Sequence, residues 1–148
     1  GRHGKGNLSR PLQVSKQLYD GGYGGSSKWP ELMPMARQER LGFASGDCRI
    51  APMFCQASVV MLRYCSGDRW LGTRTNPHPW GVYFTGHEIV RAGVQWLTSE
   101  KILKKGQKLL FGGFSAGGVG ALQSLDFVKD LTEPLNVDLK AFVGWGID

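Results

Sequence analysis

The sequence of 148 residues has few of the features that mark membrane, metal or redox proteins. No stretch approaches the roughly 18 uninterrupted apolar residues of a membrane-spanning helix, so we expect no membrane span. There are only three cysteines, and their spacing matches neither a zinc ribbon nor a CxxC redox motif. We therefore expect no metal site, and the pairing of Cys48, Cys55 and Cys65 stays open.

The sequence also lacks the usual anion-binding motifs. The formal net charge of +6 favours attraction to anionic surfaces or polymers. The basic residues, however, are not interleaved with aromatic residues as in a nucleic-acid-binding module. The Gly-rich residues 112–120 have neither the Lys-Ser/Thr pair of a P-loop nor the G-x-G-x-x-G spacing of a dinucleotide-binding turn. We expect no nucleic-acid partner and no cofactor.

The most informative stretch that is present is KLLFGGFSAGGVG, residues 108–120. A short apolar run leads into a Gly-rich turn with Ser115 at its centre, and a segment that can begin a helix follows. Residues 113–117 fit the G-x-S-x-G pattern of a nucleophile elbow, a strained turn between a strand and a helix. Glycines beside the serine allow a closer backbone approach than a Cβ atom would permit. Ser115 is therefore the predicted nucleophile.

Short apolar segments alternate with amphipathic segments along the chain. We expect strands at residues 57–64, 109–111 and 139–145, and helices at residues 85–105 and 116–131. Such alternation favours parallel strands joined by right-handed crossovers. The sequence thus predicts an α/β domain over residues 29–148, preceded by an irregular segment rich in Gly and basic residues at 1–28.

Several finer expectations concern the ends and faces of these elements. Thr85 and Glu88 form a capping-box pattern at the start of the first helix, and Gly106 marks its end. The uninterrupted apolar centre of residues 57–64 is typical of a strand covered on both faces. The predicted buried faces are Ile89, Ala92, Gly93, Trp96 and Leu97 on the first helix, and Leu122, Leu125, Val128 and Leu131 on the second.

The polar and aromatic loop at residues 65–81 follows the first predicted strand. Ligands of open α/β sheets bind at the carboxyl ends of the strands, so substrate contacts are expected in this loop. Each candidate has an alternative role in packing the loop. The candidates are Asp68, Arg69, Trp70, His78 and Trp80.

Three blocks of the sequence carry a family resemblance. They are SVVMLRYCSGDRWLG at 58–72, GGFSAGGVGAL at 112–122 and FVGWGID at 142–148. Their order and spacing resemble the pectin acetylesterase and Notum family of serine carboxylesterases. The resemblance implies an α/β-hydrolase-like three-layer fold with a mostly parallel sheet, here incomplete at the C-terminus. It also implies a secreted or extracellular carboxylic ester hydrolase that acts on an acetylated polysaccharide or an acylated protein.

The resemblance also implies roles for single residues. Ser115 would be the acyl nucleophile, and the amide of Ala116 would be one donor of the oxyanion hole. The counterpart of the family's Gly-Gly-Trp turn would supply a second donor, with Tyr in place of the usual Trp. The residues of that turn are Gly21, Gly22 and Tyr23. The predicted substrate contacts are Asp68, Trp70 and Phe114.

The sequence departs from the hydrolase pattern in its histidines. In α/β hydrolases the triad follows the order Ser, acid, His. Here His3, His78 and His87 all precede Ser115, and no histidine follows it. We expect that the chain is part of a longer enzyme and is inactive alone. The alternative is a non-catalytic pseudoenzyme or binding domain that keeps the fold.

Overall fold

The computed structural model describes residues 42, 45–79 and 82–144. The expected irregular segment at 1–28, the turn at Gly21, Gly22 and Tyr23, and Trp80 lie outside the described residues. The described residues from Tyr64 onward belong to one compact unit, and those up to Arg63 belong to another. The two units are described separately.

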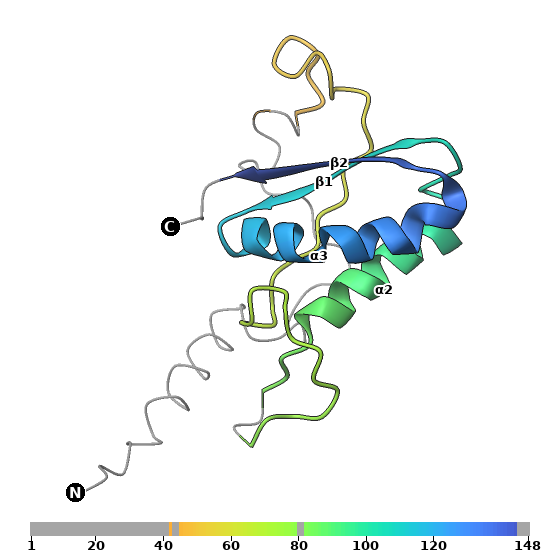
Figure 1. Ribbon diagram of the computed structural model, residues 1–148. Helices are drawn as coiled ribbons and strands as arrows, with labels where there is room; N and C mark the ends of the chain where they lie inside the picture. The colour runs from red at the N-terminus through yellow and green to blue at the C-terminus, as the bar shows by residue number, and fades with distance from the viewer. Residues whose placement is uncertain (1–41, 43–44, 80–81, 145–148) are drawn as a thin grey trace, which may run out of the picture. The chain divides into compact units, whose positions relative to one another are not determined.

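The larger unit is organised around two parallel strands, β1 (Lys108–Phe114) and β2 (Asp138–Gly144). The register pairs Lys108 with Asp138 and Phe114 with Gly144. Helix α3 (Ala116–Thr132) and the short 3-10 helix η3 (Glu133–Leu135) connect the strands (Figure 1). The last two predicted strands and the second predicted helix are confirmed. The first of these strands is longer than predicted by one residue at its start and three at its end, and the second is shifted by one residue.

Helix α3 packs against both strands and against helix α2. Its buried positions include Ala121, Ser124, Val128 and Thr132, and Val128 is fully buried. Leu122, which was expected on this face, is 52% exposed. The predicted stripe is therefore wrong at its N-terminal end, because small side chains rather than leucines face the neighbouring elements there.

Helix α2 (Gly86–Ser99) packs against α3, and its buried apolar side chains are Val90 and Val94. Trp96 was expected on the buried face but is 50% exposed, so the predicted face was centred about one residue away from the observed one.

Helix α2 also ends earlier than predicted. Lys101 adopts a left-handed φ of 56°, and Ile102 N–H donates to Leu97 O at 3.0 Å, as in a Schellman motif. Gly106 therefore does not end the helix. It forms the turn before β1, with a φ of 75° and its N–H donating to Leu135 O at 2.9 Å.

Residues 57–64 do not form the predicted strand. In the described part of the chain, the only sheet is the pair β1 and β2, and residues 57–64 are irregular. Val59, Val60 and Met61 are 40% to 46% exposed. An apolar strand of this type needs hydrogen-bonded neighbours and a covering layer on each face. The described residues supply neither a paired strand nor a covering layer. The lack of these partners outweighs the β propensity of the segment.

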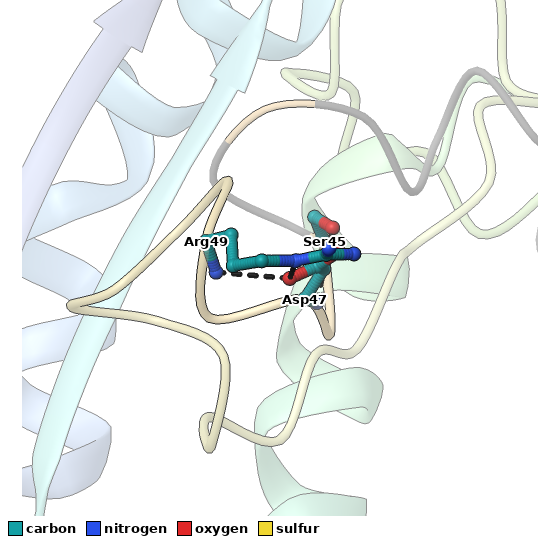
Figure 2. A network of polar contacts seen from close by, with 3 residues as sticks. All are labelled: Ser45, Asp47 and Arg49. Carbon is teal, nitrogen blue, oxygen red and sulfur yellow. Dashed lines mark hydrogen bonds and ion pairs between the residues drawn. The ribbon is translucent and has the colours of Figure 1, made fainter.

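The smaller unit contains a disulfide between Cys48 and Cys55. Around Cys48, the Asp47 carboxylate accepts hydrogen bonds from the Arg49 backbone at 2.9 Å and from the Arg49 guanidinium at 2.6 Å (Figure 2). The guanidinium lowers the pKa of Asp47. Ser45 Oγ accepts from the Asp47 backbone at 3.1 Å and completes the network. Because the ion pair is exposed, we assign it a local ordering role only.

Two glycines of α3 give the first prediction. A Cβ at Gly120 would lie 2.6 Å from Trp70 Cβ, whereas a Cβ at Gly117 would have its nearest atom, Trp70 Nε1, at 4.0 Å. Gly120→Ala should therefore destabilise the protein by about 1–3 kcal/mol through overpacking. Gly117→Ala is the matched control and should leave stability unchanged or raise it by up to about 1 kcal/mol. Urea denaturation of the intact natural protein measures both, and equal losses would contradict the packing described.

Candidate active site

Ser115 lies at the sharp junction between β1 and α3. Its backbone has φ 52° and ψ −124°, a combination that L-residues rarely adopt. Such a conformation costs of the order of 1–3 kcal/mol and persists only where the surroundings fix it. The G-x-S-x-G pattern predicts this kind of strained strand-to-helix turn around the serine.

Backbone contacts on both sides fix the Ser115 conformation. Ser115 N–H donates to Gly144 O at 3.1 Å, at the end of β2, and Ser115 O accepts from Gly118 N–H at 2.9 Å. A Cβ at Gly113 would collide with the backbone of Gly117. Gly113 is therefore required by the close approach of the strand end to the first turn of α3.

The surroundings of the Ser115 side chain suit an oxyanion. Ser115 is exposed, and its own N–H already donates a hydrogen bond to Gly144 O. Among the described residues, no acceptor is bonded to the N–H groups of Ala116 and Gly117 in the first turn of α3. The N-terminus of this 17-residue helix also carries the positive end of the helix dipole. A negatively charged oxygen beside Ser115 would thus meet preorganised donors.

The predicted substrate contact Asp68 is engaged in a network inside the protein. Both of its carboxylate oxygens accept hydrogen bonds, and the donors come from its own loop and from the start of α2. They are Ser66 Oγ, Trp70 N at 3.0 Å, Gly72 N at 3.1 Å and Gly86 N at 2.8 Å. These bonds give Asp68 a structural role, and a contact with substrate stays a prediction.

Asp68 also replaces the predicted cap of α2. Thr85 occupies the N-cap position, but its side chain makes no capping hydrogen bond, so the capping-box prediction is wrong. The Asp68 carboxylate, 18 residues away, accepts from Gly86 N–H instead. A carboxylate bonds this amide and also interacts favourably with the helix dipole, which a neutral hydroxyl cannot match.

The other predicted substrate contacts differ in exposure. Trp70 is 6% exposed and packs against Gly120 of α3. Phe114 directly precedes Ser115, is 52% exposed, and lies with its ring centroid 5.6 Å from that of Phe142. Of the predicted contacts, Phe114 alone combines proximity in sequence to Ser115 with an exposed apolar surface.

The two described histidines are placed in other contacts. The His87 ring lies 4.3 Å from the ring of Phe127 on α3. The His78 ring lies 5.9 Å from that of Phe84, and His78 N–H donates to Val82 O at 2.8 Å. Neither arrangement is that of a general base on Ser115.

Two titratable groups lie next to Asp68. Burial raises the pKa of the Cys65 thiol, and the negative charge of Asp68 adds to the effect. Burial likewise raises the pKa of Tyr64, whose hydroxyl accepts a hydrogen bond from Arg69 N–H at 2.6 Å. Cys65 is a free thiol. With its raised pKa, it is mostly protonated near neutral pH and is a weak nucleophile.

Comparison with known proteins identifies the family. A family model described as Pectinacetylesterase matches residues 4–147. The chain belongs to the pectinacetylesterase family. The resemblance carried by the three sequence blocks is thereby confirmed, and the match extends across almost all of the chain.

Relatives within the pectinacetylesterase family are known by name. The palmitoleoyl-protein carboxylesterase NOTUM of Schmidtea mediterranea is 38% identical over 91 residues, covering 60% of this chain and 16% of that protein. The palmitoleoyl-protein carboxylesterase notum1a of Danio rerio is 33% identical over 128 residues, covering 83% of this chain and 24% of that protein. The chain thus spans a quarter or less of these relatives.

A solved structure supports the fold. The crystal structure of the Wnt deacylase Notum from Drosophila matches with a TM-score of 0.70 at 30% identity, over 87% of this chain and 36% of that one. A second crystal form gives a TM-score of 0.69. The predicted α/β-hydrolase-like fold class is therefore confirmed.

Within residues 42, 45–79 and 82–144, no helix is long and apolar enough to cross a membrane. The same residues contain no group of three or more His, Cys, Asp or Glu side chains placed to hold a metal ion.

The role of Asp68 leads to a second prediction. Asp68→Asn replaces one of the two acceptor oxygens with an NH2 group. At least one of the four groups that donate to the carboxylate then loses its acceptor. The loss should cost about 1–3 kcal/mol of unfolding free energy. Thr85→Ala is the control and should change little, because this hydroxyl caps nothing. Chemical denaturation of the intact protein distinguishes the two, and a larger loss for Thr85→Ala would restore the capping box.

Proposed function

We propose that this chain carries the nucleophile of a serine carboxylesterase, with Ser115 as that nucleophile and the Ala116 amide as one oxyanion donor. The observation that carries the proposal is the strained, exposed Ser115 at the N-terminus of α3. The relatives are carboxylesterases by name, which supports the same reaction class.

The proposed reaction is acyl transfer in two steps. Ser115 Oγ attacks the ester carbonyl carbon and loses its proton to a general base, and the carbonyl oxygen becomes an oxyanion beside Ala116 N–H. The C–O bond to the alcohol then breaks, and the alcohol takes the proton and leaves an acyl-serine. Water attacks this ester in the same manner, releases the carboxylic acid and restores Ser115.

The general base is the part of the mechanism that these 148 residues do not provide. The order Ser, acid, His places both partners after the nucleophile, and no histidine follows Ser115. We therefore assign the acid and the base to protein outside the 148 residues. The 148 residues alone are then inactive, because a serine hydroxyl is a weak nucleophile without a base. A second oxyanion donor from Gly21, Gly22 and Tyr23 is part of the same proposal.

An acylated protein is the favoured substrate. The named relatives act on palmitoleoyl-protein, and Phe114, the residue before Ser115, gives an exposed apolar surface. An acetylated polysaccharide is the second candidate, because the family model is named for pectin acetyl esters and the chain has a net charge of +6. A secreted or extracellular location fits the Cys48–Cys55 disulfide, since disulfides persist in oxidising compartments.

A third prediction tests the nucleophile. Ser115→Ala in the intact natural protein should abolish hydrolysis of p-nitrophenyl esters and labelling by a fluorophosphonate, because the attacking oxygen is gone. Ser99→Ala, which removes an exposed hydroxyl on α2, is the matched control and should keep both. The 148 residues expressed alone should show no hydrolysis that depends on Ser115. Activity of the intact protein that survives Ser115→Ala would overturn the assignment, and an intact protein inactive on every ester would favour a pseudoenzyme.

A fourth prediction separates the two substrates. The intact protein should have a higher kcat/KM for p-nitrophenyl octanoate than for the acetate, and should release acid from a palmitoleoylated serine peptide. Phe114→Ala should lower kcat/KM for octanoate about tenfold, as expected for the loss of about 1–3 kcal/mol of apolar contact, and affect the acetate less. Faster acetate release from acetylated pectin than from the acyl peptide would instead favour the polysaccharide.

A further inference from the structure

We infer that Trp70 is a positioning residue for the elbow: it supports the first turns of α3 from the side opposite the sheet and thereby fixes Ser115 and the Ala116 amide. This inference rests on the proposed function of Ser115. It assigns Trp70, which sequence reasoning placed among the substrate contacts, to a role behind the nucleophile.

The start of α3 is weak when considered alone. Gly117, Gly118 and Gly120 fall within its first five residues. A glycine inside a helix costs about 1 kcal/mol relative to alanine. Ser115 at the N-cap makes no side-chain capping bond, and its backbone is strained. The turn that carries the proposed oxyanion donor must therefore be held by packing against other elements.

Two opposite sides of this turn are packed closely. On the sheet side, a Cβ at Gly118 would lie 3.0 Å from Val143 Cγ1. On the other side, a Cβ at Gly120 would lie 2.6 Å from Trp70 Cβ. The indole nitrogen of Trp70 extends to 4.0 Å from the corresponding position at Gly117. Trp70 thus spans about one turn of α3, and the glycines allow the approach.

Trp70 is itself held in place. Arg69 and Trp70 have left-handed φ values of 57° and 68°, which side chains other than glycine seldom adopt. Trp70 N–H donates to Asp68 Oδ1 at 3.0 Å, while the other oxygen of Asp68 accepts from Gly86 at the start of α2. The Tyr64 ring lies 5.3 Å from the indole, and its hydroxyl accepts from Arg69 N–H.

The geometry sets the expected kinetic effect. Trp70 is 6% exposed, so it does not contact substrate and its loss should leave KM nearly unchanged. The position of the Ala116 N–H relative to the oxyanion acts in the transition state, and a displacement of about 1 Å can cost about a hundredfold in rate. A defect in positioning should therefore appear in kcat.

The experiment compares Trp70→Leu and Trp70→Phe in the intact natural protein. Trp70→Leu should lower kcat for a p-nitrophenyl ester by about tenfold or more, with KM within about twofold, and slow labelling by a fluorophosphonate. Trp70→Phe keeps a ring against α3 and should show an intermediate loss. Val94→Ala removes a buried side chain from α2, which is not part of the elbow, and controls for lost stability. All variants are assayed at a temperature where circular dichroism shows them folded.

The outcomes separate this inference from the proposed function. The proposed function is overturned if the fluorophosphonate does not label Ser115 of the wild type, or if Ser115→Ala keeps its esterase activity. Labelled wild type together with unchanged kcat in Trp70→Leu leaves the function standing and overturns the positioning role. A raised KM with unchanged kcat also overturns the positioning role, because Trp70 would then contact substrate. An equal fall in kcat for Val94→Ala overturns it as well. If Trp70→Leu does not fold, the kcat of Trp70→Phe decides in the same way.

Discussion

The backbone conformation of Ser115 is the constraint on which the rest of the larger unit depends. With φ 52°, the chain reverses from β1 into α3 within one residue, and this brings α3 back across both strands. The same reversal brings the first turn of α3 so close to β1 that a Cβ at Gly113 has no room. The hydrogen bond from Ser115 N–H to Gly144 O then ties the elbow to β2. Strain at this residue and the parallel β1–α3–β2 arrangement are therefore parts of one structure.

The Asp68 carboxylate connects the start of helix α2 to Trp70, which packs on α3. It fixes the left-handed Trp70 through the backbone and caps α2 through Gly86, so one charged group orients both a buried ring and a helix start. The ring lies against Gly120 in the helix that begins at the elbow. A path of direct contacts thus runs from the start of α2 through Asp68 and Trp70 to α3, the helix that begins at the proposed nucleophile. Such a path is physical adjacency, and kinetic coupling along it is what the Trp70 variants measure.

The sequence was informative where a pattern is local and misleading where a distant group decides. The elbow, α3 and both strands could be predicted because glycine spacing and apolar periodicity act within a few residues. The cap of α2 could not, because the carboxylate that bonds Gly86 N–H comes from 18 residues away. Packing was the alternative role for Trp70, but its packing partner could not be predicted, because Gly120 is 50 positions along the chain. Residues 57–64 do not form the predicted strand, because the β propensity of a segment does not provide a neighbouring strand for it to pair with.

The elbow also shows how the chemistry is divided. In the proposed function, one oxyanion donor comes from the first turn of α3, and this turn and the groups that hold Ser115 lie between Tyr64 and Gly144. Proton transfer needs a base, and the two described histidines pack against phenylalanines instead. The conformation of the turn at Ser115 is therefore a local property of these residues, and backbone hydrogen bonds and close packing surround it. Because the strained turn is held by these local contacts, the acid and base that the proposed function assigns to protein outside the 148 residues would only have to be oriented toward a turn that is already formed.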